Sequence, residues 1–291
     1  MAMGKDVALV LSSGGARGLA HIGAIQELEA QGYRITSIAG CSMGALIGGV
    51  YAAGKLTEFR EWMKTIDRRR MLELTDFSLS INHLAKGTRI IEAIMEFVPD
   101  MPIEDLPIPY CAVATDWKAG HEVVFREGSL FEAIRASISL PSFYEPVRRD
   151  GMILIDGGVT NPIPMNRVER HEGDLLVAID VSGHDYEAQW EVQHELAEKR
   201  KHSTSLSQQI LNRLIPDNIE FNHYTMLSRV NSIMIRQNSL LMAQLMKPDV
   251  LVDIQMSRYT TFDFDKSEKL IAIGRQKTIQ ALANRLKGLL T

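Results

Sequence analysis

The sequence is poor in cysteine and carries no excess of positive charge. Its only two cysteines in 291 residues, Cys41 and Cys111, are too few for a disulfide framework, and no Cys/His spacing is typical of a zinc site. We therefore expect a reducing compartment, no structural metal and no cofactor. The formal net charge of -4 gives no broad positive field for a phosphate backbone, so nucleic acid is not an expected partner.

Long apolar runs are also missing. The apolar run near the N-terminus, Val7 to Leu11, has five residues, whereas the core of a signal peptide needs about 7–15. Ile35 to Gly54 holds twenty residues without a charge, but five of them are glycines, which favours a strand, a turn and a small-residue helix over a membrane span. We expect a cytoplasmic protein, with at most peripheral membrane contact.

Strand-length apolar runs alternate with segments of helical periodicity, which predicts a three-layer α/β/α fold with a mainly parallel central sheet. The expected strands are Asp6 to Leu11, Ile35 to Cys41, Tyr110 to Asp116, His121 to Phe125, Met152 to Asp156, Asp174 to Val181 and Asp249 to Gln255. The expected helices include one from Arg17 that stops before Gly32, then Met43 to Ala53, Leu56 to Leu74, Phe131 to Ser139 and a terminal helix from Lys266.

Two further patterns have a structural and a functional interpretation. The basic run Arg68 to Arg70 is typical of a solvated helix end, although it could also meet anionic lipid headgroups. A series of apolar residues at helical spacing is expected to face the core, although methionine-rich faces also suit acyl chains. Its members are Met226, Val230, Met234, Leu241 and Leu245.

The residues Gly40 to Gly44 form a G-x-S-x-G motif between an expected strand and an expected helix. A serine on such a sharp turn projects its Oγ at the carboxyl end of the sheet, and Gly40 and Gly44 let the backbones pass closely. The motif therefore predicts Ser42 as a nucleophile. The structural alternative is a turn that merely lets the strand and helix approach each other.

A second glycine-rich loop, Gly14 to Gly18, follows the first expected strand and opens a helix. Such loops present backbone N–H groups to an oxyanion or a phosphate. No Lys-Ser/Thr pair follows, which excludes a Walker loop, and the next strand ends without the acid that a dinucleotide site needs. An oxyanion hole contributed by Gly14, Gly15, Ala16, Arg17 and Gly18 fits better than a plain turn.

The expected nucleophile needs a base. Asp156 ends an apolar strand and is followed by Gly157 and Gly158, so its carboxylate is delivered to a fixed place and could accept the Ser42 proton. The alternative order Ser, Asp, His leaves histidines in polar stretches without a recognisable setting: His171, His184, His194, His202 and His223. His21 lies on an apolar helix and is expected to pack or cap.

Taken in order, the loop at Gly14 to Gly18, the motif at Gly40 to Gly44 and Asp156-Gly157-Gly158 resemble the three signatures of bacterial patatin-like phospholipases, similar to the catalytic domain of neuropathy target esterase. Ser13 stands where the fuller family pattern has a third leading glycine. The resemblance covers roughly residues 5–182. It implies one patatin-like domain over 1–291, in which 183–247 form a mostly helical segment over the active-site entrance.

The resemblance also implies a function. It predicts a serine acyl hydrolase with a Ser42-Asp156 dyad, which cleaves carboxylic esters of phospholipids or lysophospholipids without a metal. Two alternatives belong to other classes. An acyltransferase of related fold would place a histidine against the serine, and a non-catalytic lipid-binding regulator would keep the pocket without turnover. The sequence does not indicate the oligomeric state.

Overall fold

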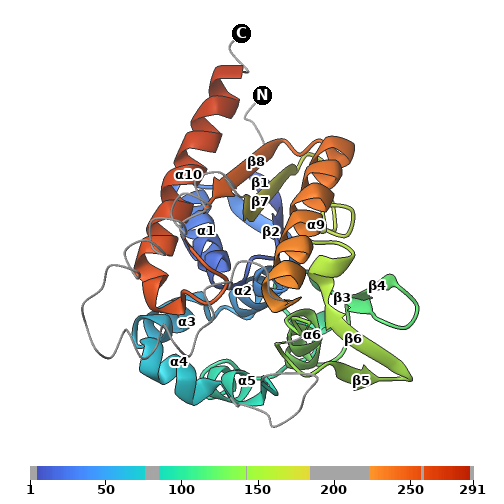
Figure 1. Cartoon of the computed structure of the whole chain (residues 1–291). Coiled ribbons are helices and arrows are strands. Elements are labelled where there is room, and N and C mark those ends of the chain that lie inside the picture. The colour runs from blue at the N-terminus through green and yellow to red at the C-terminus, as the bar shows by residue number, and fades with distance from the viewer. Residues whose placement is uncertain (1–4, 76–84, 142, 184–222, 257–258, 289–291) are drawn as a thin grey trace, which may run out of the picture.

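The fold is built around one mixed eight-stranded sheet (Figure 1). A computed structural model describes residues 5–75, 85–141, 143–183, 223–256 and 259–288. The strand order is β5-β6-β3-β2-β1-β7-β8, and β4 pairs with β3 beside this path. The strands are β1 Asp6–Leu11, β2 Arg34–Cys41, β3 Tyr110–Asp116, β4 His121–Phe125, β5 Val147–Arg149, β6 Met152–Asp156, β7 Leu175–Gly183 and β8 Val250–Gln255.

The centre of the sheet is parallel and one end of it is antiparallel. Strands β3, β2, β1, β7 and β8 run parallel to one another, whereas β4 and β6 are antiparallel to β3 and β5 is antiparallel to β6. This confirms the expected mainly parallel sheet and adds β5, which the sequence patterns did not reveal. Because β1, β2 and β7 are parallel, the loops that follow them meet at one edge of the sheet.

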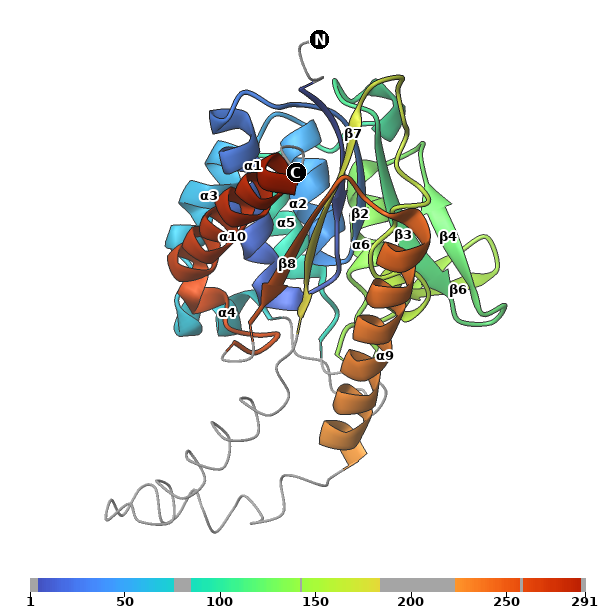
Figure 2. The same cartoon turned by 90° about the horizontal axis from the view of Figure 1, so that it is seen from above.

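Helices cover both faces of the sheet, as Figure 2 shows from above. The larger layer contains α1 Ala20–Ala30, α2 Met43–Ala52, α3 Leu56–Lys64, α4 Arg68–Leu74, α5 Thr88–Met95, α6 Leu130–Ser137 and α10 Ser267–Gly288; α9 His223–Met246 lies on the opposite face. Alternate residues of β1 point into the two layers: Val7, Leu9 and Leu11 join the larger core, whereas Ala8 and Val10 join the core beneath α9.

The prediction of one helix from Leu56 to Leu74 is wrong, because α3 and α4 are separate helices. The intervening Ile66 is only 3% exposed, so the chain turns inward to bury it. Asp67 then accepts a hydrogen bond from the backbone N–H of Arg70 at 2.7 Å, which starts the second helix. Arg69 and Arg70 lie exposed on α4, as expected for a solvated helix.

The expectation that the apolar stripe of α9 faces the core is also wrong. Its members Met226, Val230, Met234, Leu241 and Leu245 are 46–75% exposed. The face of α9 that packs on the sheet instead carries Met242, Ala243 and Met246, together with the fully buried Ser239. The helix is apolar around most of its circumference, so helical spacing could not identify the buried side.

Helices α1 and α10 cross with their backbones in direct contact. A Cβ added to Gly274 of α10 would lie 1.9 Å from the carbonyl oxygen of Ala20, and one added to Gly23 of α1 would lie 1.9 Å from that of Ile271. The two glycines therefore allow an approach that any other residue would prevent.

We predict that Gly274→Ala destabilises the protein by about 1–3 kcal/mol, because the helices must separate to admit the methyl group. Replacing glycine by alanine inside a helix otherwise stabilises by roughly 0.5–1 kcal/mol, so a net loss isolates the contact. The midpoint of urea unfolding measures the effect. Gln276→Ala, on the exposed face of the same helix, is the control. A Gly274→Ala protein as stable as the wild type would contradict this packing.

Candidate active site

The turn after β2 holds Ser42 in a strained backbone conformation. Ser42 has φ 54° and ψ −121°, and α2 begins at the next residue. Non-glycine residues rarely adopt positive φ, and such strain is commonly held at functional sites. Gly44 makes the turn possible, because a Cβ there would lie 2.2 Å from the carbonyl oxygen of Leu11 at the end of β1. The elbow expected from Gly40 to Gly44 is therefore formed.

A second hydroxyl fixes the elbow from α6. The backbone N–H of Ser42 donates to Ser137 Oγ at 2.8 Å, and Ser137 Oγ donates to the carbonyl oxygen of Val113 in β3 at 2.6 Å. Ser137 is fully buried. Local sequence does not reveal this role of Ser137, since its partners are 24 and 95 residues away along the chain.

Ser42 and Asp156 are in direct contact. Ser42 Oγ donates a hydrogen bond of 2.5 Å to Asp156 Oδ2, and the backbone N–H of Gly158 donates to Asp156 Oδ1 at 2.7 Å. Both carboxylate oxygens are thus engaged, and Asp156 is only 3% exposed. Asp156 arrives on β6, which is antiparallel to β3, with its Cα paired to that of Ala114. Gly157 then packs against the carbonyl oxygen of Val113.

Burial dominates the electrostatics of Asp156. It raises the pKa of this carboxyl group to about 6, although the hydrogen bonds from Ser42 and Gly158 act in the opposite direction. No cation within the described residues pairs with Asp156. The carboxylate is therefore more basic than an ordinary aspartate while still ionised at neutral pH.

The glycine-rich loop borders the same site. The loop passes through Gly15 at φ 57° into a short 3-10 helix, Gly15–Leu19. The N–H of Ala16 donates to the carbonyl oxygen of Thr261 at 2.8 Å, so that donor is occupied. Among the described residues, the N–H groups of Gly14 and Gly15 have no acceptor. Of the five residues expected in an oxyanion hole, these two keep donors available.

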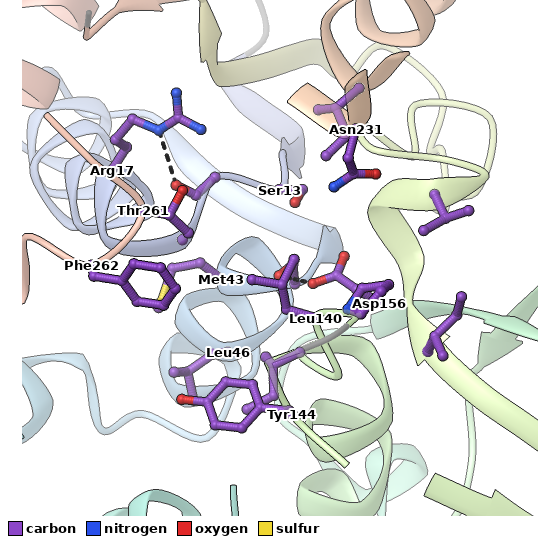
Figure 3. Close-up of a pocket in the computed structure, with 18 of the residues that line it drawn as sticks. Ser13, Arg17, Met43, Leu46, Leu140, Tyr144, Asp156, Asn231, Thr261 and Phe262 are labelled. Carbon is purple, nitrogen blue, oxygen red and sulfur yellow. Dashed lines mark hydrogen bonds between the residues drawn. The ribbon is translucent and has the colours of Figure 1, made fainter. Parts of the chain in front are cut away.

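Arg17 and Gly18 contribute packing. Arg17 Nε donates to the carbonyl oxygen of Gly14 at 3.1 Å, which braces the loop (Figure 3). A Cβ on Gly18 would lie 2.3 Å from Met43 Cγ, so the loop rests directly on the residue that follows Ser42. The loop and the elbow therefore form one packed unit.

No described histidine is hydrogen bonded to Ser42 Oγ, whose partner is Asp156. His21 is fully buried, and its Nε2–H donates to the carbonyl oxygen of Ser12 at 2.9 Å, in keeping with a packing role. Burial lowers the pKa of His21 to about 4, so its ring is neutral. His171 is half exposed beside Glu169. The other candidates, His184, His194 and His202, lie outside the described residues, as does the side chain of His223.

Ser42 and Asp156 open into a cavity of about 360 Å³. Figure 3 shows Ser13, Arg17, Thr261 and Asn231 towards one side of it, and Met43, Leu46 and Tyr144 towards the other. Its described walls also include Ile90, Ile91, Ile94 and Phe264. The contributions of α5 and of residues 261–264 were not expected, because no local motif marks them. Helix α9 falls within the segment 183–247 that was expected over the entrance, and residues 184–222 of that segment lie outside the described residues.

A model of the family described as Patatin-like phospholipase matches residues 9–168, which is more than half of the chain. The chain belongs to this family. The matched range of this patatin-like chain includes the glycine-rich loop, Ser42 and Asp156, whereas α9, Thr261 and α10 lie outside it.

Curated relatives carry names from the same family. An uncharacterized NTE family protein of Mycobacterium bovis is 49% identical over 177 residues, 61% of this chain and 49% of that protein. Patatin-like phospholipase domain-containing protein 6 of Homo sapiens is 34% identical over 190 residues, and neuropathy target esterase sws of Drosophila melanogaster 33% over 189. Each of these two matches covers 62% of this chain, but only 14% of the human protein and 13% of the Drosophila protein. The patatin-like chain thus spans at most about half the length of these relatives.

The fold has a solved neighbour. VipD from Legionella pneumophila aligns with a TM-score of 0.51 over 97% of this chain and 67% of its own, at 13% sequence identity. This likeness supports the patatin-like fold alone. Within the described residues, no helix is both long and apolar enough to span a membrane.

We predict that Asp156→Asn raises the melting temperature at neutral pH by several degrees. The folded-state pKa of Asp156 is about 6, above the ordinary 3.8. The contribution of this group to stability is therefore fully present below pH ~4 and is lost as pH rises through ~6, by about 3 kcal/mol for a shift of this size. Asparagine removes this loss.

Melting curves between pH 3.5 and pH 8 check the sign. The stabilisation by Asp156→Asn should shrink towards zero as pH falls below about 4, where Asp156 of the wild type is protonated in both the folded and the unfolded state. Asp105→Asn, at an exposed position, is the control and should leave the melting temperature unchanged. A variant less stable than the wild type at pH 8 would contradict the assigned environment of Asp156.

Proposed function

We propose that this patatin-like chain is a serine acyl hydrolase of the phospholipase A or lysophospholipase type. The observation that carries the proposal is the 2.5 Å hydrogen bond from Ser42 Oγ to the buried Asp156 carboxylate at the floor of a largely apolar cavity. Family membership and the names of the relatives support lipid esters as the substrate class.

In the proposed first half-reaction, Asp156 accepts the proton of Ser42 while Oγ attacks the ester carbonyl carbon. The elevated pKa of Asp156 makes this transfer less unfavourable than it would be for an ordinary aspartate. The tetrahedral intermediate collapses by breaking the bond to the alcohol, which takes the proton from Asp156. An acyl-enzyme on Ser42 remains, and the lysolipid or glycerophosphate alcohol leaves.

In the second half-reaction, water replaces the alcohol. Asp156 accepts a proton from the water as its oxygen attacks the acyl carbon, and the proton returns to Ser42 Oγ when the fatty acid leaves. Both intermediates carry negative charge on the former carbonyl oxygen. We infer that the N–H groups of Gly14 and Gly15 stabilise it, since their donors have no acceptor in the described structure.

The described contacts favour hydrolysis over the acyltransferase alternative. The described hydrogen-bond acceptor of Ser42 Oγ is a carboxylate, and no described imidazole lies in the cavity. The regulator alternative gains no specific support. A protein that only binds lipid has no use for a strained serine against a buried carboxylate that lacks a described cationic partner, and both features cost stability.

We predict that Ser42→Ala abolishes ester hydrolysis and fluorophosphonate labelling while the protein stays folded, because the variant lacks the nucleophile. Asp156→Asn should retain Ser42 but lose at least ~10² in kcat, since the amide cannot accept the proton. Initial rates on p-nitrophenyl butyrate, with circular dichroism for folding, provide the measurement. Near wild-type turnover by Ser42→Ala would end the serine-hydrolase proposal.

We predict that Gly15→Ala lowers kcat by ~10²–10³ with little change in KM, and slows labelling of Ser42. At φ 57° an added Cβ would lie 2.3 Å from Thr261 Cγ2, so the loop must move and turn its N–H groups away from the oxyanion. Gly54→Ala is a matched control, since Gly54 also has positive φ but has nothing within 4 Å of its added Cβ. If Gly15→Ala and Gly54→Ala have the same kcat and label at the same rate, the loop contributes packing alone.

A further inference from the structure

A second, smaller cavity lies directly behind the apolar wall of the main one. It has a volume of about 20 Å³, and its described lining consists of hydrophobic side chains alone. Its far side is built by α3 and α4 through residues such as Phe59, Met63 and Leu74. A cavity of this size has room for about one water molecule, but its apolar lining favours a hydrocarbon group instead.

The two cavities share one wall. The side chains that line both are Met43, Leu46, Ile90, Ile94 and Phe264. We call these five residues the partition. Leu46 lies one helical turn beyond Ser42, with its backbone N–H bonded to the Ser42 carbonyl at 3.1 Å. The partition therefore begins beside the expected nucleophile and extends away from it along α2 and α5.

Polarity separates the two ends of the main cavity. Ser13, Arg17, Asn231 and Thr261 lie towards the side of the glycine-rich loop and α9 (Figure 3). The wall made by the partition carries no hydrogen-bonding side chain other than the thioether of Met43. The partition therefore offers the acyl chain of an ester bound at Ser42 an apolar wall, and the polar side chains offer its alcohol hydrogen-bonding partners.

We propose that the partition is the end wall that sets acyl-chain length, and that Ile94 is its specificity-determining residue. This rests on the proposed function. Ile94 is 1% exposed and lies on α5, apart from the loop, the elbow and the acidic motif. Replacing Ile94 by alanine would join the two cavities and leave Ser42 and its hydrogen-bond partners unchanged. Longer acyl chains then reach the space against α3 and α4.

The test compares three isoleucine-to-alanine variants on the same helix. Ile94→Ala and Ile90→Ala open the partition, and Ile90 is only half buried, so its variant keeps the test available if Ile94→Ala does not fold. Ile91→Ala is the matched control, because Ile91 lines the main cavity but not the small one. The substrates are p-nitrophenyl esters from butyrate to palmitate and lysophosphatidylcholines with chains of eight to sixteen carbons.

The readout is the ratio of kcat/KM for the longest to that for the shortest chain. We expect this ratio to rise at least tenfold in Ile94→Ala and Ile90→Ala, within the range that one or two methylenes give in a hydrophobic pocket. Ile91→Ala should leave the ratio unchanged. A loss of packing alone would lower all rates together.

Two results would overturn the proposal, and they are distinguishable. If the wild type hydrolyses butyrate but the ratio stays fixed in both partition variants, or moves equally in Ile91→Ala, the partition does not set chain length and the hydrolase function stands. If the wild type hydrolyses no acyl ester, the proposed function fails and the chain-length proposal fails with it.

Discussion

The hydrogen bond between Ser42 and Asp156 joins residues 114 positions apart, and much of the architecture is arranged so that it can form. Strand β3 lies between the two strands that carry these residues, with Cys41 paired to Val113 and Asp156 paired to Ala114. The turns that follow β2 and β6 pass close to the neighbouring strands, Gly44 against the carbonyl oxygen of Leu11 and Gly157 against that of Val113. Small residues at the elbow and after Asp156 allow this approach, and the buried hydroxyl of Ser137 fixes it.

This arrangement costs stability. Asp156 is ionised at neutral pH in a buried place without a described cationic partner, and Ser42 is held at a positive φ. His21 Nδ1, nearby and fully buried, has no hydrogen-bond partner among the described residues. The surrounding core offsets these costs, since the parallel strands β1, β2, β3, β7 and β8 and the larger helical layer bury a continuous apolar cluster.

The cavity is built from two parts of the chain, one inside and one outside the range that the family model matches. The expected reacting groups all lie within residues 9–168, the range matched by the family model. Residues 261–264 and α9 complete the walls from outside that range, and the backbone of Thr261 holds the glycine-rich loop. The proposed reacting groups and most of the cavity lining therefore lie in the region that the family model matches, whereas one part of the cavity wall comes from outside it.

Much of the fold could be predicted from local sequence patterns. Sequence patterns located seven of the eight strands to within two residues, and the central strands stand out because strands buried on both faces need continuous apolar sequence. The motifs around Gly14 and Ser42 follow consecutive expected strands, so their meeting at one edge of the sheet could be expected, whereas the pairing of Asp156 with Ser42 rested on the apolar strand before it and on the family resemblance. The three-residue strand β5 carries too little local signal and was missed, and α5 was missed although Ile90, Ile91 and Ile94 recur at helical spacing.

The sequence by itself determined the order of elements, the elbow, the loop and the acid that follows an apolar strand, because each depends on residues only a few positions apart. Only the tertiary structure decided that β6 runs antiparallel, that Ala16 N–H is occupied by Thr261, and which face of α9 is buried. It also decided that Ile90 and Ile94 separate two cavities. These features are contacts between distant segments, and their energies depend on packing that no local periodicity encodes.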